Sequence, residues 1–141
     1  MHVVLEAGVD ASPATVFASI TGDPSTWTWF PIRVHGQVTG TDAPDVGASR
    51  EFSMLGARVL ETVLACEPPA RWAYRGDSSS LPLFRALIEL WTIEAHEGQS
   101  TVRWTLAADP RGPVAVLAAL AAPLLRRTFR QAMTKLGQAS P

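Results

Sequence analysis

A few charged and hydroxyl side chains fall on strand positions shared with large apolar residues, and these are the residues that could do chemistry. In SREFSM, Arg50 shares a face with Phe52, and in LIELWTIEA, Glu89 shares a face with Trp91. Tyr74 lies on the apolar face of ARWAYRG. An arginine or tyrosine can polarise a carbonyl group, and a carboxylate whose pKa is raised by an apolar pocket can abstract a proton. Arg50, Tyr74 and Glu89 are therefore the candidate catalytic residues.

Two interpretations of these charges stay open. If Arg50 and Glu89 both point inward, they pair with each other or hold a polar group of a ligand, because an unpaired buried charge is costly. If the strand register places them at the end of the sheet, they lie in water. Glu61 belongs to a strand whose two faces are both apolar, so alternation does not fix its direction. No motif in the sequence defines a catalytic set.

The sequence argues against several other kinds of site. Its three histidines and single cysteine, Cys66, lack metal-ligand spacing, so we predict no metal and no cofactor. Cys66 has no basic neighbour in sequence and is predicted to be a small buried hydrophobe. There is no G-x-S-x-G motif and no glycine-rich phosphate loop. The net charge of −1, with no clustered basic face, argues against a nucleic-acid partner.

Aromatic residues are concentrated in the stretch DPSTWTWFPIR, which holds Trp27, Trp29 and Phe30. Further tryptophans occupy predicted inward positions, among them Trp72 and Trp104. Simple core filling is one interpretation of this aromatic surface. The other is that the aromatic residues line a cavity, because they exceed what a sheet-on-helix core of this size needs.

Helix and strand signals predict a single α+β domain over residues 1–141. A first strand, HVVLEAGVD, precedes a helix capped by Ser12, and Asp23-Pro24 repeats the helix-start signal, so two short helices follow the strand. Six further strands separated by turn residues predict a seven-stranded curved antiparallel sheet. A long helix from about Val114 to Leu136 is expected to cover its inner face.

The long helix begins with the apolar run VAVLAALAAPLL, which is interrupted by Pro123. This run is shorter than the roughly 20 apolar residues that a membrane-spanning helix needs, and no signal peptide opens the chain, so a cytoplasmic protein is predicted. The run is apolar nearly all round. It is either covered by the sheet and the short helices, or it forms a gate or a surface for a membrane or a partner.

The order of elements and several local phrases resemble the START-like, or helix-grip, superfamily (SRPBCC), and within it the polyketide cyclase/dehydrase-type branch. The phrases are VDASPATVFASITGDPSTW, the W-x-P of Trp29 to Pro31, the stretch from Glu67 to Arg75, and GQSTVRWTL. The resemblance covers nearly the whole chain. It implies a hydrophobic cavity between sheet and C-terminal helix, which relatives use for lipids, sterols, polyketides or quinones. The superfamily holds both carriers and enzymes, so it does not fix the chemistry.

Three functions follow from these observations. The first is binding of an apolar small molecule without transforming it, the second is a cyclase or dehydratase reaction on a polyketide-like substrate, and the third is a partner-binding module with a filled cavity. A homodimer is left open. The residues expected to bind the ligand are Trp27, Trp29, Phe30, Arg50, Phe52, Glu61, Trp72, Tyr74, Glu89, Trp91, Trp104, Leu117, Leu120 and Leu124.

Overall fold

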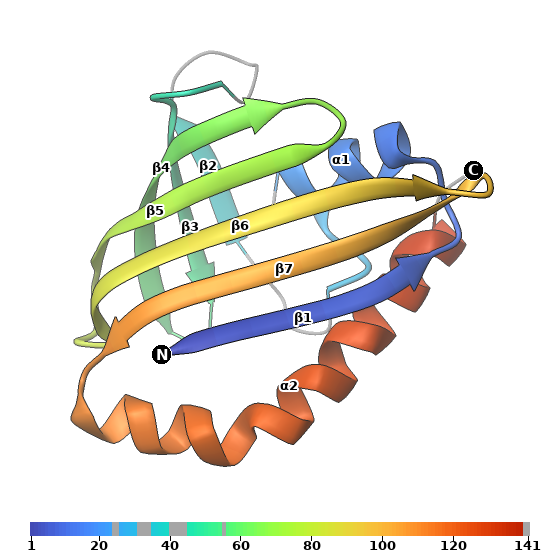
Figure 1. Ribbon diagram of the computed structural model, residues 1–141. Helices are drawn as coiled ribbons and strands as arrows, with labels where there is room; N and C mark the ends of the chain where they lie inside the picture. The colour runs from blue at the N-terminus through green and yellow to red at the C-terminus, as the bar shows by residue number, and fades with distance from the viewer. Residues whose placement is uncertain (24–25, 31–34, 40–44, 55, 140–141) are drawn as a thin grey trace.

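The computed structural model describes the chain except for residues 24–25, 31–34, 40–44, 55 and 140–141. A curved antiparallel sheet forms one layer, and a long C-terminal helix lies along the edge that carries the first strand (Figure 1). The predicted α+β class, with an antiparallel sheet and a long C-terminal helix, is confirmed. The elements in chain order are β1 (His2–Val9), α1 (Pro13–Thr21), β2 (His35–Thr39), β3 (Ser49–Met54), β4 (Ala57–Glu67), β5 (Arg71–Ser79), β6 (Phe84–His96), β7 (Gln99–Pro110) and α2 (Gly112–Ala139).

The sheet has the strand order β1-β7-β6-β5-β4-β3-β2, so consecutive strands pair from β2 to β7 and the first strand joins the last. The hairpin between β6 and β7 turns at Glu97 and Gly98, which both have positive φ values of 50° and 81°. A glycine tolerates this conformation without steric cost, which explains why the turn falls at the predicted EGQS stretch. The meander brings the inward residues of β3 to β7 onto one face.

Helix α1 begins as its sequence predicts. The Ser12 hydroxyl accepts a hydrogen bond from the Thr15 backbone N–H at 3.3 Å, and Pro13 occupies the first turn. Val16, Phe17 and Ile20 are buried on its inner side. The second short helix, expected over DPSTWTWF, does not extend through residues 27–30, where residues 28–30 form bends; Thr26 is in 3₁₀-helical geometry, its N–H bonded to the Asp23 carbonyl, and residues 24–25 lie outside the described residues.

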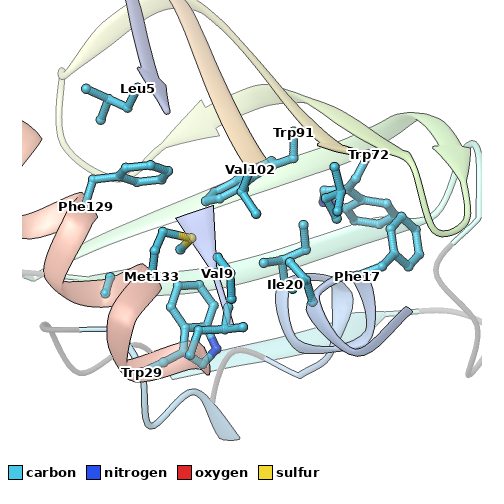
Figure 2. Close-up of a cluster of buried hydrophobic side chains, with 14 of the residues drawn as sticks. Leu5, Val9, Phe17, Ile20, Trp29, Trp72, Trp91, Val102, Phe129 and Met133 are labelled. Carbon is cyan, nitrogen blue, oxygen red and sulfur yellow. The ribbon is translucent and has the colours of Figure 1, made fainter. Parts of the chain in front are cut away.

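The C-terminal half of α2 is fixed to the sheet by a buried apolar cluster. Phe129 and Met133 from α2 meet Leu5, Val9 and Val102 from the sheet, while side chains of α1 complete the cluster (Figure 2). The buried residues of α2 are Phe129, Ala132, Met133 and Leu136. Their spacing places them on one helical face. This half of α2 is therefore the anchored half.

In the first half of α2, residues 112–124, the structure contradicts the predicted direction of three leucines. Leu117, Leu120 and Leu124 were expected to line the cavity, but their side chains are 64%, 76% and 65% exposed. The positions about one and two turns before Phe129 are instead Leu125 and Ala122, and both are half-buried. The first half thus presents small residues toward the sheet and its leucines outward.

Of the residues that the structure describes, one helix, α2, is long and apolar enough by length and composition to cross a membrane. This is weak evidence, because the core helices of soluble proteins meet the same criterion. The buried residues of its C-terminal half pack against the sheet and α1. The absence of a membrane-spanning segment, inferred from the length of the apolar run, stays a prediction.

Candidate functional site

Strand register gathers the predicted polar residues on the inner face of the sheet. Arg50 of β3 lies opposite Glu61 of β4, and Tyr74 of β5 lies opposite Glu89 of β6. Trp104 of β7 lies opposite Trp91 of β6 on the same face. The alternation argument thus placed Arg50, Tyr74 and Glu89 on the correct side of their strands, and the register settles the open direction of Glu61.

Arg50 and Glu61 form an ion pair in the protein interior. The Arg50 Nε donates to Glu61 Oε2 at 3.0 Å, and Arg50 Nη2 lies 2.9 Å from the same oxygen. The two residues are only 5% and 1% exposed. The pairing of Arg50 with Glu89, which the sequence left open, does not form, because Glu89 is bound to other residues. Breaking such a buried pair leaves an uncompensated charge and is costly.

Each partner of the ion pair keeps one buried atom without a hydrogen-bond partner among the described residues. These atoms are Arg50 Nη1, a donor, and Glu61 Oε1. The indole N–H groups of Trp27 and Trp72 are also buried and unpaired, and both rings lie about 6 Å from the Arg50 guanidinium carbon, at 5.8 and 5.9 Å. Native interiors rarely leave such groups unsatisfied. Unpaired buried polar atoms therefore surround the Arg50 guanidinium.

A second hydrogen-bond network adjoins the ion pair. The Tyr74 hydroxyl donates to Glu89 Oε2, and the Trp104 indole N–H donates to the same oxygen at 2.9 Å. The Trp91 indole N–H donates to the Tyr74 hydroxyl oxygen at 3.4 Å. The Arg50 guanidinium carbon lies 5.0 Å from the centre of the Tyr74 ring, which links the two groups. The three candidate catalytic residues therefore lie next to one another, with Tyr74 between Arg50 and Glu89.

Burial changes the protonation of this cluster. Removal from water raises the pKa of Glu61 from 4.5 to about 8, against the attraction of Arg50, and it also raises the pKa of Glu89. Burial and the two carboxylates raise the pKa of Tyr74 well above its ordinary value, so its hydroxyl stays protonated. Burial on its own lowers the pKa of Arg50. The attraction of Glu61 and Tyr74 for the positive charge outweighs this effect, so the pKa of Arg50 is raised. One cation, Arg50, thus faces two carboxyl groups, Glu61 and Glu89. Near neutral pH the cluster therefore still holds a proton that exposed carboxyl groups would already have lost.

The retained proton makes stability depend on pH. Folded Glu61 keeps its proton up to a pKa of about 8, whereas the unfolded chain loses it near 4.5, so the free energy of unfolding should fall as pH rises through this window. The slope is at most about 1.4 kcal/mol per pH unit for one proton. Urea unfolding across the window should show a shallower slope for Glu61→Gln. The exposed control Glu67→Gln should keep the wild-type slope, and an unchanged slope in Glu61→Gln would contradict the assignment.

Aromatic rings form the wall beside the polar cluster. Trp91 and Trp104 stack with ring centres 5.5 Å apart, and Trp104 stacks on Phe129 of α2 at 6.1 Å. Trp104 remains half-buried, so this stack keeps an accessible edge. Phe129 was assigned to the apolar stripe of the helix, and sequence reasoning missed its place beside the two tryptophans. Its helical spacing from Met133 and Leu136 was the signal that could have found it.

The predicted rim residues have different environments. Trp29 is buried in the core, whereas Trp27 and Phe30 are half-buried and pack against it. Trp27 also lies over Arg50, so it is the member of this group that reaches the polar site. Phe52 is half-buried on β3. Among the described residues, no group of three or more histidine, cysteine, aspartate or glutamate side chains could hold a metal ion.

A curved antiparallel sheet and a long C-terminal helix form a START-like, helix-grip fold (Figure 1). The chain belongs to the family described as "Polyketide cyclase / dehydrase and lipid transport", which matches residues 1–140. The polyketide cyclase-type branch inferred from local phrases is thereby confirmed. No match was found among curated proteins.

Solved structures share the fold at low sequence identity. A START superfamily protein from Mycobacterium smegmatis aligns with a TM-score of 0.77 at 13% identity, over 99% of both chains. A protein from Mesorhizobium loti aligns with a TM-score of 0.74 at 17% identity, over 100% of both chains. The Aha1 dimer from Colwellia psychrerythraea gives a TM-score of 0.69 at 17% identity, over 99% of both chains. At these identities the likeness establishes the fold alone.

Proposed function

We propose that this protein binds a hydrophobic small molecule between the inner face of the sheet and α2, with a polar group of the ligand at Arg50 and Glu61. The observation that carries the proposal is the pair of buried atoms, Arg50 Nη1 and Glu61 Oε1, left without partners. An unsatisfied buried polar atom costs about 1–3 kcal/mol, and more when it is charged. A ligand oxygen that accepts hydrogen bonds from Arg50 Nη1 and from the protonated carboxyl of Glu61 would remove that cost.

The surroundings of the polar site suit an apolar ligand body. The stacked rings of Trp91, Trp104 and Phe129 provide flat apolar contacts beside Glu89. On α2, Ala122 lies about two turns before Phe129 and is half-buried, so this position carries a small side chain. Ligand sites of this kind combine apolar walls with a few polar groups that fix orientation. Lipid-, polyketide- and quinone-like molecules all have this character.

The matched compounds 1-naphthol and naphthalene test the polar contact, because they differ by one hydroxyl group. Tryptophan fluorescence should report binding of both, with naphthol bound at least about tenfold more tightly, the value of one good hydrogen bond to a charged group. Arg50→Met should remove this preference. The control Arg103→Met alters an exposed ion pair with Glu6 and should preserve it. Equal affinity for the two compounds in the wild type would contradict the proposed polar contact.

A second candidate function is a cyclase or dehydratase reaction. The observation that favours it is the convergence of Arg50, Tyr74, Glu61 and Glu89 in adjoining contacts. In such a reaction a carboxylate would remove a proton from a carbon next to a ketone, and the carbanion would attack a second carbonyl carbon, whose oxygen Arg50 polarises, to close the ring. The hydroxyl formed at that carbon would then leave as water as a C=C bond forms. Incubation with an aromatic poly-β-ketone mimic should then yield a dehydrated ring, detected by its loss of water in mass spectrometry. Glu89→Gln should stop turnover while binding persists; binding without product in the wild type would favour the carrier.

A further inference from the structure

The outer face of α2 carries an apolar surface that nothing in the described part of the chain covers. We call Val116, Leu117, Leu120 and Leu124 the outer leucine face. Their exposed fractions lie between 61% and 76%. Their spacing places them together on the side of the helix away from Phe129 and Met133. Adjacent exposed apolar residues of this size mark an interaction surface.

A loop of the sheet lies beside the start of α2. The backbone N–H of Arg111, just before α2, donates to the Leu83 carbonyl at 3.1 Å, so the loop between β5 and β6 abuts the start of the helix. Leu81 in that loop is 44% exposed. Figure 1 shows the first half of α2 running from the end of β7 along the outside of the molecule.

The second half of α2 contributes positive charge. Arg126, Arg127, Arg130 and Lys135 are exposed, and α2 contains no aspartate or glutamate. None of these four cations has an ion-pair partner within the part of the chain that the structure describes. Arg127 lies about one turn after Leu124, so positive charge continues directly from the outer leucine face.

We propose that the outer leucine face docks on the surface of an anionic lipid bilayer, with α2 lying in the plane of the interface. Apolar side chains beside unpaired arginines are the composition that binds helices to anionic membrane surfaces. A second copy of the same face fits less well, because symmetric pairing would bring two uncompensated basic helices together. A bilayer crossing does not fit, because the C-terminal half of α2 is packed in the core. The proposal does not depend on the proposed function.

Vesicle co-sedimentation of the full chain tests the docking surface. The wild type should bind phosphatidylcholine vesicles that contain phosphatidylglycerol and should bind pure phosphatidylcholine weakly. Leu120→Glu should reduce binding at least about tenfold, since a charge replaces an inserted apolar group. The pair Arg126→Glu and Arg127→Glu should also lose about tenfold, on the anionic vesicles only, and added salt should weaken the wild type.

Leu64→Glu is the matched control, because Leu64 is an exposed leucine on β4 and is 39% exposed. It should bind the anionic vesicles like the wild type, and circular dichroism should show all variants folded. The proposal is overturned if the wild type fails to bind anionic vesicles or if Leu120→Glu binds as well as the wild type. It is also overturned if the wild type is a dimer in solution that Leu120→Glu dissociates while vesicle binding is absent, because the occupant is then a second copy.

Discussion

Above the Glu61 pKa of about 8, where this carboxyl is ionised, replacing Arg50 by methionine is expected to lower the free energy of unfolding by about 3 kcal/mol, because the substitution leaves the Glu61 carboxylate buried without its countercharge. The cost arises from the buried Glu61 carboxylate left without a partner and not from lost packing, because methionine fills much of the arginine side chain's volume. Glu61 also loses its hydrogen bond to Arg50 Nε. Urea unfolding with fluorescence detection measures the change.

The double variant Arg50→Met with Glu61→Leu should recover most of that loss, because it removes both charges from the interior. Arg103→Met, which breaks an exposed pair with Glu6, should cost less than about 1 kcal/mol. If the double variant is as unstable as the sum of the two single variants, the coupling between Arg50 and Glu61 is absent and the assigned pair is wrong.

Truncation of Leu136 to alanine is expected to cost about 2–5 kcal/mol, because the side chain is 1% exposed in the core and its removal leaves a cavity. The same truncation at Leu120, on the same helix, should change stability by no more than about 0.5 kcal/mol. The two variants remove identical groups from α2, so thermal or urea unfolding compares its anchored half directly with its outer leucine face. Equal losses at the two positions would show that the first half of α2 is also packed.

Local signals predicted most of the fold. Ser12 and Pro13 begin α1, and strand alternation assigned the correct face to Arg50, Tyr74 and Glu89. The sequence did not predict which side of the first half of α2 faces the sheet. The run VAVLAALAAPLL is apolar nearly all round and contains no polar stripe that marks the outer side. The buried residues of the second half, such as Phe129, determine which side of the whole helix faces the sheet.

The pairing of the charges escaped prediction for a different reason. A period of two gives the face of a strand but not its register with its neighbour. The hairpin at Gly56 brings Glu61 opposite Arg50, and a register irregularity between Leu60 and Glu61 shifts the next pairing. Glu89 is two strands further away and binds Tyr74 instead. In the short segment after Asp23, the rings of Trp27, Trp29 and Phe30 pack on one another and against the core, and residues 28–30 form bends despite the helix-start signal at Asp23.

Native mass spectrometry of the purified protein, followed by solvent extraction, tests the central claim most directly. The account predicts a stoichiometric adduct of an apolar molecule that bears at least one oxygen, either as purified or after incubation with fatty acids, sterols, quinones and aromatic polyketides. The adduct should be lost or weakened in Arg50→Met. An unliganded mass that no compound in this panel changes would contradict the account and would favour a filled interior that serves a protein partner.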